Sequence, residues 1–307
     1  MEFLKWLESI RTPFGEWFFM FWTVGGEEIM LLGLICILFW CVDKKLAYRL
    51  TFSYLPSALA IDVIKLACRI ERPWVRDPSF TAVERAKKSA TGYSFPSGHT
   101  QNATALFGSL AYTRKKLLYR ILLLLIIPMV MLSRMYLGVH TPADVLTSLA
   151  ISSVIVFGIN LLADRLEITP KRRLIIACCF VCIAIGTMIY TYLLYQSGTI
   201  AYKDAADSFK GCGGGLGFSI CWVLEAKYVN FSVKCDKLWK QFVKVLIGVG
   251  VLLLLKEGLK YGFRALFGQN FLAEVIRYFL LMNWAMLGMP LIIKRFFQPK
   301  EEPAQLS

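Results

Sequence analysis

The chain has 307 residues, of which 57% are hydrophobic and 18% charged, and its mean hydropathy is +0.55. An average soluble domain has about 25% charged residues, so this chain has fewer than expected. It also contains long apolar runs separated by short charged clusters, and both features argue against a soluble protein. They predict an all-α, polytopic membrane bundle. The net charge of +14 arises mostly from Lys and Arg at the ends of apolar runs, so no nucleic-acid partner is expected.

The N-terminal segment, residues 1–26, is aromatic and is interrupted by charges and by Pro13. Such a segment suits the membrane interface, and it lacks the plain apolar stretch of a cleaved signal peptide. A six-span core is expected over residues 27–195. Its spans are expected at about 27–42, 46–68, 97–112, 117–138, 142–162 and 174–195.

The C-terminal part, residues 196–295, is expected to add about three membrane helices before a polar tail at 296–307. A loop of about twenty residues that ends in the glycine run 211–217 should come first. The glycines either permit close helix packing or belong to a flexible loop. The additional helices are expected at about 216–230, 242–260 and 271–293.

Short clusters of Lys and Arg mark one set of helix ends, which the positive-inside tendency assigns to the cytoplasm. The loop at 70–96 and the turn that carries His140 would then face outward. The 70–96 loop also contains positive residues, and these do not count as topology signals if they bind a phosphate. An active site on the extracytoplasmic face is therefore expected.

Three polar clusters interrupt the apolar pattern, and the first is K-x6-RP, from Lys65 to Pro73. Lys65 and Arg72 are seven residues apart, so they share a face if the helix continues as far as Arg72. Pro73 is expected to end that helix. Two basic residues that extend to the interface from a helix end would give the same pattern.

The second cluster is PSGH, from Pro96 to His99, at the start of the third span. Pro-Ser-Gly before a helix exposes free backbone N–H groups at the positive end of the helix dipole, which predicts an anion site. Ser97 either caps the helix or donates its hydroxyl group to the anion. His99 falls in the first helical turn.

The third cluster is SRMYLGVHTPAD, which contains Arg134, His140 and Asp144 between two apolar runs. Ionisable residues at membrane depth indicate a functional site. About one helical turn separates His140 from Asp144, so the carboxylate can bind one imidazole nitrogen and leave the other free to attack. Asp144 also suits the first turn of a helix that starts at Thr141-Pro142. Both histidines of the chain lie in these clusters, which disfavours a structural role for either.

Together, K-x6-RP, PSGH and SR-x5-H-x3-D resemble the three-part signature of the type 2 phosphatidic acid phosphatase superfamily. The resemblance covers about residues 27–195. The aromatic N-terminus and the additional C-terminal helices look more like the architecture of sphingosine-1-phosphate phosphatases than like the minimal six-span bacterial form.

The resemblance implies a membrane lipid phosphate phosphatase, a hydrolase of lipid metabolism that forms a phosphohistidine. His140 would be the nucleophile, Asp144 would hold its tautomer, and His99 would protonate the leaving oxygen. Fixed cations can take the place of metal ions, so neither a metal nor a cofactor is expected. The groups that would bind the phosphoryl oxygens belong to Lys65, Arg72, Ser97, Gly98 and Arg134.

Two alternatives stay open: a phosphotransferase that passes the phosphoryl group to a lipid or sugar acceptor, and a lipid transporter. A transporter predicts charges spread through several spans, whereas the charges here gather at one face. The motifs do not identify the lipid, because phosphatidate, phosphatidylglycerophosphate, sphingoid phosphates and polyprenyl (di)phosphates present similar headgroups. They also leave the oligomeric state undetermined.

Overall fold

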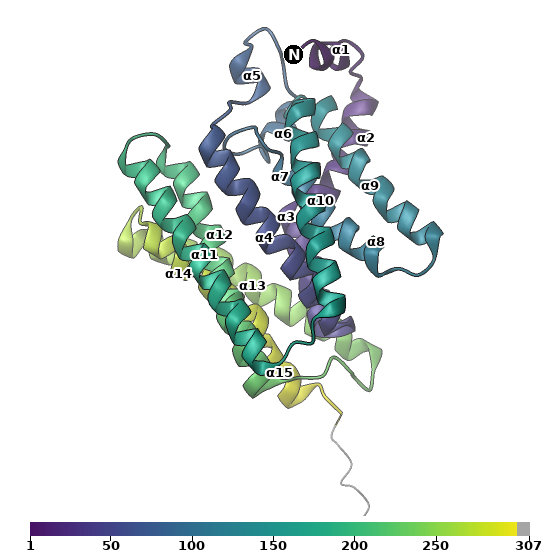
Figure 1. The fold of residues 1–307 in the computed structure, drawn as a ribbon, viewed down its shortest axis with the longest axis vertical. Coiled ribbons are helices and arrows are strands. Elements are labelled where there is room, and N and C mark those ends of the chain that lie inside the picture. Colours follow the sequence, from purple (N-terminus) through teal and green to yellow (C-terminus); the bar gives the residue numbers. More distant parts are fainter. Residues whose placement is uncertain (300–307) are drawn as a thin grey trace, which may run out of the picture. The chain divides into compact units, whose positions relative to one another are not determined.

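A computed structural model describes residues 1–299, which are mainly helical and contain no β-strand (Figure 1). This confirms the all-α prediction. The chain forms two compact units. The first comprises Met1–Leu34, Arg49–Glu167 and Leu194–Asp204; the second comprises Ile35–Tyr48, Ile168–Leu193 and the described residues from Ala205 onward. All eight predicted site residues lie in the first unit, whereas the domain boundaries expected from the sequence stay a prediction.

The N-terminal segment of the first unit forms two helices, α1 (Glu2–Ser9) and α2 (Pro13–Thr23). Helix α1 is amphipathic, since Leu4 and Leu7 are buried while neighbouring aromatic side chains remain exposed. It lies across the ends of α9 and α10 (Figure 1). Helix α2 starts where Pro13 was predicted to break the segment, because Thr12 caps it and proline suits the first helical position.

The helical segments that follow agree with the first six predicted spans to within a few residues. Helix α3 continues into a π-helical turn, and the third predicted span is divided into α7, a π-helical turn and α8. The 70–96 loop contains two short helices, α5 and α6. The elements up to the sixth span are η1 (Val24–Gly26), α3 (Glu28–Ile37), η2 (Leu38–Val42), α4 (Lys44–Cys68), α5 (Pro73–Arg76), α6 (Glu84–Lys87), α7 (Gly98–Ala103), η3 (Thr104–Gly108), α8 (Ser109–Thr113), α9 (Leu117–Tyr136), α10 (Pro142–Arg165) and α11 (Pro170–Gln196).

The predicted loop before the glycine run is wrong, because residues 202–224 form one helix, α12 (Tyr202–Leu224). The glycines sit inside it, where they let α14 approach. A Cβ atom on Gly213 would lie 2.4 Å from the carbonyl oxygen of Val275, and one on Gly217 would lie 2.7 Å from Cβ of Met282. The C-terminal elements are α12, η4 (Glu225–Val229), α13 (Leu238–Phe267), α14 (Phe271–Asn283), η5 (Trp284–Gly288) and α15 (Met289–Phe296). The tail at 300–307 lies outside the described residues.

Replacing Gly213 with alanine is expected to destabilise the protein by about 1–3 kcal/mol, because the new methyl group overlaps the backbone of α14. The matched control is Gly214→Ala in the same helix, where a Cβ atom meets no atom within 4 Å. That change should leave stability equal or higher, since alanine favours helix more than glycine does. Thermal unfolding in detergent measures both, and equal melting temperatures would contradict the close packing.

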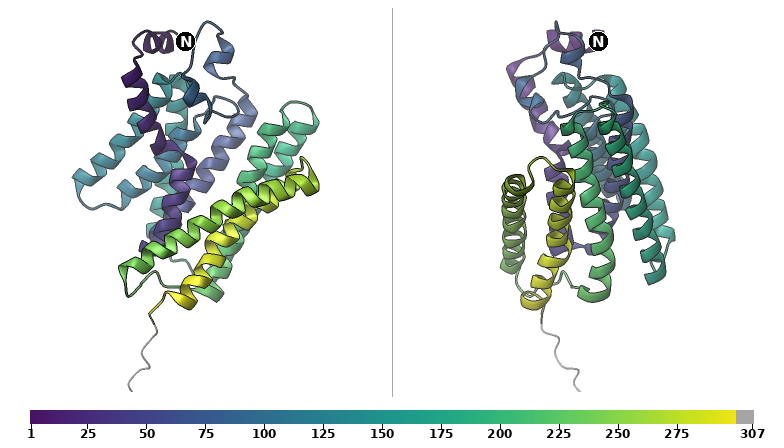
Figure 2. Two further views of the ribbon diagram at one scale, coloured as in Figure 1. Left: turned by 180° about the vertical axis from the view of Figure 1, so that it is seen from behind. Right: turned by 90° about the vertical axis from the view of Figure 1, so that its left-hand side faces the viewer.

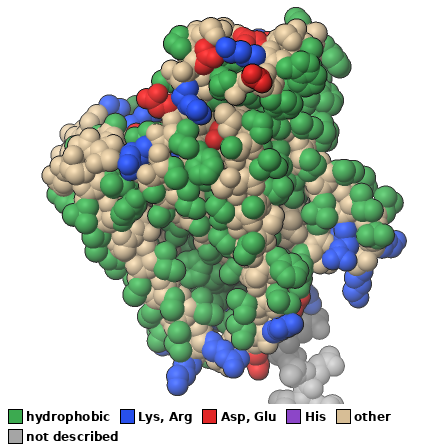
Figure 3. All heavy atoms as spheres, turned by 45° about the horizontal axis from the view of Figure 1, so that its top comes forward, with side chains coloured by type: hydrophobic (Ala, Val, Ile, Leu, Met, Phe, Trp, Pro, Cys, Tyr) green, Lys and Arg blue, Asp and Glu red, His purple; other side chains and the backbone are tan. Residues whose placement is uncertain are grey.

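Five helices in the described part of the chain are long and apolar enough to cross a membrane, and a sixth span results if the bent pair Pro13–Gly26 and Glu28–Val42 counts as one. Figure 3 shows a face that is largely hydrophobic, with charged side chains mostly gathered in patches near its edges. Together these features identify a multi-pass membrane protein.

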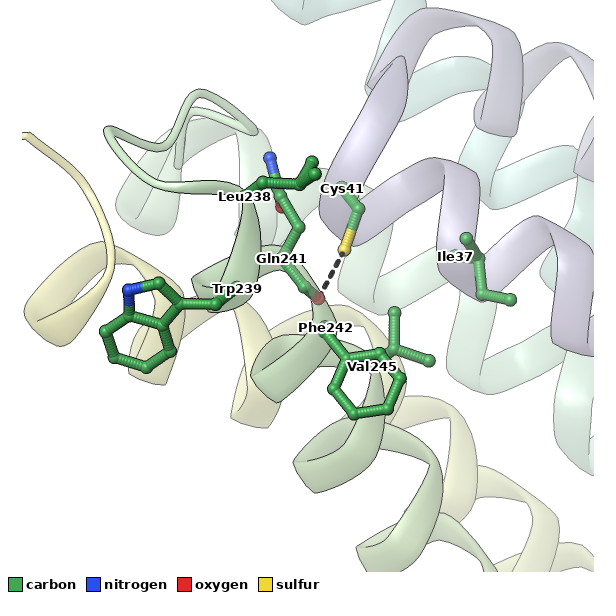
Figure 4. A pocket seen from close by; sticks show the side chains of 7 residues that line it. All are labelled: Ile37, Cys41, Leu238, Trp239, Gln241, Phe242 and Val245. Atoms are coloured by element: carbon green, nitrogen blue, oxygen red, sulfur yellow. Dashed lines mark hydrogen bonds between the residues drawn. The ribbon is translucent and has the colours of Figure 1, made fainter.

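The second unit contains an apolar pocket formed by α3, η2 and α13 (Figure 4). Cys41 Sγ donates to the carbonyl oxygen of Gln241 across 3.6 Å at its edge. None of the lining residues belongs to a predicted motif, whereas all of the predicted site residues lie in the first unit. The lining residues are Ile37, Cys41, Leu238, Trp239, Gln241, Phe242 and Val245.

Candidate active site

The turn between α9 and α10 carries His140 and is fixed by backbone hydrogen bonds. The carbonyl oxygen of Arg134 accepts from the N–H groups of Val139 (3.0 Å) and His140 (3.3 Å). Thr141 and Asp144 then form a reciprocal cap. The Thr141 hydroxyl accepts from the Asp144 N–H (3.3 Å), and Asp144 Oδ2 accepts from the Thr141 N–H (2.8 Å). Helix capping therefore places the Asp144 carboxylate beside the imidazole of His140.

Each nitrogen of His140 has a defined neighbour. Nδ1 lies 3.3 Å from Asp144 Oδ2, and Nε2 lies 2.9 Å from Nη1 of Arg72. The side chain of Ser94 donates to the same carboxylate oxygen at 2.6 Å. Burial, and after it the positive charge of Arg72, hold the pKa of His140 well below its ordinary value. The guanidinium group of Arg72 can only donate, so Nε2 accepts with its lone pair and the proton of the neutral ring lies on Nδ1, facing Asp144.

The helix that carries Lys65 ends before Arg72, close to the end predicted for the second span and before Pro73, which was expected to end it. Helix α4 ends at Cys68, Arg69 has a left-handed φ of 51°, and Pro73 starts α5 instead of ending a helix. Proline favours the first helical position and disfavours helical backbone in the residue before it. Because α4 ends at Cys68, the condition for Lys65 and Arg72 to share one helical face is not met. Lys65 lies in the last turn of α4, and its contact with phosphate stays a prediction.

Arg72 reaches the site through its own side chain, which backbone carbonyl groups hold in place. Nε donates to the oxygen of Gly92 (3.0 Å), Nη2 to that of Thr91 (2.7 Å), and Nη1 to that of Val139 (3.0 Å). These contacts fix the buried guanidinium group next to Nε2 of His140. Arg72 is therefore positioned to contact a phosphoryl group as it approaches that nitrogen.

The PSGH motif forms the predicted start of a helix. Ser97 is the N-cap of α7, and its hydroxyl accepts from the N–H of Thr100 at 3.4 Å. The capping role is thus present, and the hydroxyl hydrogen remains available for donation to an anion. Ser97 N–H donates to the carbonyl oxygen of Asp144 (3.1 Å), which joins this motif to α10. Apart from its chain neighbours and its own helix backbone, no atom of residues 1–299 lies within 4 Å of a Cβ built on Gly98, so there is space beside it for a ligand.

Arg134 is completely buried at the end of α9. Its Nη1 donates to the hydroxyl of Thr23 at 3.4 Å, and that hydroxyl lies 2.9 Å from the one of Ser133. Nε and Nη2 have no hydrogen-bond partner within residues 1–299. A buried cation with two unused donor atoms is suited to a bidentate phosphoryl ligand. Ser133, which had no role from the sequence, contacts Thr23 and so supports this group.

His99 lies in the first turn of α7, and its Nε2 is 3.3 Å from Oε1 of Glu27. Sequence reasoning missed both Glu27 and Ser94. Glu27 is an acidic residue at the start of an apolar span, which is itself a signal of function. Ser94 lies just before PSGH, but nothing in the sequence indicates that its hydroxyl meets Asp144.

The arrangement unites groups from all three motifs. Asp144 joins the second motif to the third, and Arg72 joins the first to the third. Both guanidinium groups, of Arg72 and Arg134, act electrostatically on both imidazole rings. A neutral nucleophilic imidazole, fixed cations and a second imidazole with its own carboxylate are the parts that transfer of a phosphoryl group requires.

Comparison with known proteins finds similarity to one superfamily. A model of the PAP2 superfamily matches residues 46–168, and a model described as a PAP2 superfamily phosphatase, transmembrane extension, matches residues 209–301. The first match contains every predicted site residue. The chain is also 30% identical to phosphatidylglycerophosphatase B of Bacillus subtilis over 174 residues, which cover 53% of this chain and 78% of that protein.

Sphingosine-1-phosphate phosphatase 2 is also similar to this chain. The mouse (Mus musculus) protein is 29% identical over 158 residues, which cover 48% of this chain and 42% of that protein. The human (Homo sapiens) protein is 28% identical over 157 residues, which cover 48% of this chain and 37% of that protein. The chain therefore spans about two fifths of the length of these mammalian relatives. No solved structure matches the chain.

Proposed function

The chain belongs to the PAP2 superfamily, and from that premise we propose that it hydrolyses a lipid phosphate through a phosphohistidine at His140, without a metal ion. The observation that carries the proposal is the environment of His140. This ring is buried, its Nδ1 contacts Asp144, and its Nε2 contacts the guanidinium group of Arg72. A phosphoryl group bound by Arg72 would lie next to the nitrogen that attacks it.

In the first step, the lone pair on Nε2 of His140 forms a bond to phosphorus while the bond from phosphorus to the lipid oxygen breaks. The departing oxygen keeps the electron pair of that bond and takes a proton from His99. Asp144 stabilises the positive charge that develops on the His140 ring. Water then attacks phosphorus and gives a proton to His99. The bond from phosphorus to Nε2 breaks, its electron pair returns to His140, and phosphate is released.

The cations of the site supply the stabilisation for which many phosphoryl-transfer enzymes use metal ions. Arg72 and Arg134 have rigid planar groups that match the phosphoryl oxygens, and the N–H group of Gly98 adds a neutral donor. Ser97 donates its hydroxyl hydrogen, and Lys65 adds a charge from the last turn of α4. Because these groups are built into the chain, we expect activity without added metal.

The purified protein in detergent is expected to release phosphate from a lipid phosphate at an unchanged rate in the presence of EDTA. A panel of phosphatidate, phosphatidylglycerophosphate, a sphingoid phosphate and a polyprenyl diphosphate tests the substrate class. Two of these correspond to the names of the relatives. Loss of all activity with EDTA, recovered by a divalent cation, would contradict the metal-independent mechanism.

Transfer of the phosphoryl group to another acceptor starts from the same intermediate and differs only in what attacks it. Substrate with a labelled phosphoryl group, supplied with an acceptor lipid and a sugar, separates the two outcomes. We expect the label in free phosphate, and label recovered on the acceptor would reject hydrolysis.

The proposed orientation of the site is tested in sealed vesicles with a membrane-impermeant lipid phosphate. We expect hydrolysis only when this substrate is added on the extracytoplasmic side.

A further inference from the structure

Glu27 lies between η1 and α3, and its carboxylate is held against the second imidazole of the site. Oε1 is 3.3 Å from Nε2 of His99. The side chain of Glu27 is 34% exposed and that of His99 only 11% exposed. The carboxylate thus sits on the accessible side of a nearly buried ring.

The backbone around Glu27 is fixed by contacts with the helix that carries His99. A Cβ atom on Gly26 would lie 2.7 Å from the carbonyl oxygen of His99, so only glycine allows this approach. Asn102, one turn further along α7, donates from Nδ2 to the carbonyl oxygen of Gly26 at 2.9 Å. Glu27 N–H donates to the carbonyl oxygen of Val24 (3.0 Å). The position of Glu27 beside His99 is therefore built into the packing of η1 on α7.

The charges around His99 disfavour its protonated form, which is the form that can act as an acid. To give a proton to the leaving oxygen, the ring must first carry two protons and a positive charge. Burial of the ring disfavours that form, and the positive charges of Arg134 and Arg72 disfavour it further. The carboxylate of Glu27 contacts the ring and acts against these effects.

We propose that Glu27 is a positioning residue that orients His99 and favours its protonated form for its role as the acid, which deepens the function proposed above and rests on it. When the bond from phosphorus to the lipid oxygen breaks, that oxygen takes the electron pair and a proton from a ring nitrogen of His99. The ring becomes neutral, and the carboxylate remains ionised. In hydrolysis of the phosphohistidine, the proton from water returns to the ring and restores its pairing with Glu27. The site would thus contain two carboxylate–imidazole pairs, one for attack and one for departure.

The test compares two leaving groups in the full-length Glu27→Gln protein. An alkyl lipid phosphate needs a proton on its departing oxygen, whereas p-nitrophenyl phosphate releases a stable phenolate. We expect kcat to fall about 10²-fold on the lipid phosphate and less than about 3-fold on the aryl phosphate. KM should change little for either. The basic limb of the pH profile of kcat for the lipid phosphate should move to lower pH, because the protonated ring loses its partner.

Glu28→Gln is the matched control. Glu28 is the next residue, and its carboxylate accepts from the hydroxyl of Tyr54 at 2.7 Å. That change should leave both activities within about 2-fold of the wild type, because it removes an acid of the same kind that does not contact His99. Glu27→Asp, which keeps the charge on a shorter side chain, should recover part of the lipid phosphatase activity and report on the pair even if the glutamine variant is unstable.

Equal losses on the two substrates in Glu27→Gln, or no loss on either, would overturn the proposed role of Glu27. A loss on the lipid phosphate that Glu27→Asp does not reduce would also overturn it, since it would indicate a purely structural role. Failure of the proposed function is separate. In that case wild-type protein given labelled aryl phosphate would form no phosphohistidine at His140.

Discussion

Replacing His140 with alanine is expected to lower phosphate release from a lipid phosphate by at least ~10³-fold. The change removes the nitrogen that forms the bond to phosphorus. It leaves the carboxylate of Asp144 with donors from Ser94 and Thr141, so the fold around it should persist. The protein is mixed rapidly with substrate that carries a labelled phosphoryl group, and the label bound to the protein is tested for its stability in acid and in base. The acid-labile, base-stable phosphoryl group of the wild type should be absent from the variant.

The other histidine of the chain provides the control for this experiment. His99→Ala should also lose lipid phosphatase activity, but it should still form the phosphohistidine from p-nitrophenyl phosphate, whose leaving group needs no acid. This outcome would assign attack to His140 and protonation to His99. Full activity in His140→Ala, or an unchanged labelled intermediate, would contradict the assignment of the nucleophile.

The apolar pattern was sufficient to predict most of the membrane helices, because a span needs a long hydrophobic run and its ends need charge or a turn. Helices α9 and α10 follow their predicted spans closely. The same reasoning failed for α12. The local sequence predicted a loop that ends in its glycines. The glycines instead allow a helix to pack closely against Val275 and Met282, which lie far along the chain. A local sequence pattern does not predict which distant segment a helix will pack against.

The candidate site shows the same division between local and distant information. The pairing of His140 with Asp144 follows from a spacing of about one turn and a capping box, so the sequence predicts it. Arg72 meets His140 because the helix ends at Cys68 and Arg69 adopts a left-handed backbone conformation, which helical periodicity does not predict. Glu27 meets His99 only because η1 packs on α7. The motifs therefore predict which residues act, while the supporting contacts come from tertiary structure.

Arg134 is expected to increase the activity of the protein but to lower its stability. Its guanidinium group is completely buried, and two of its nitrogen atoms have no hydrogen-bond partner in the described chain. A buried and incompletely paired charge costs several kcal/mol, which bound phosphate can offset. The protein without substrate thus retains an incompletely paired cation, and we propose that its unused donors bind the phosphoryl oxygens in the transition state.

Replacing Arg134 with methionine is therefore expected to lower activity at least ~10²–10³-fold while raising stability by about 1 kcal/mol or more. Inorganic phosphate should raise the melting temperature of the wild type and have little effect on the variant, because the phosphate loses its buried cation.

Arg11→Met is the matched control, since Nε and Nη1 of Arg11 donate to the carbonyl oxygens of Tyr136 (3.1 Å) and Thr81 (2.8 Å). It should lose stability and retain most of its activity. Thermal unfolding and phosphate release in the same detergent measure both quantities, and an Arg134→Met protein that is both less stable and fully active would show that this guanidinium group is structural.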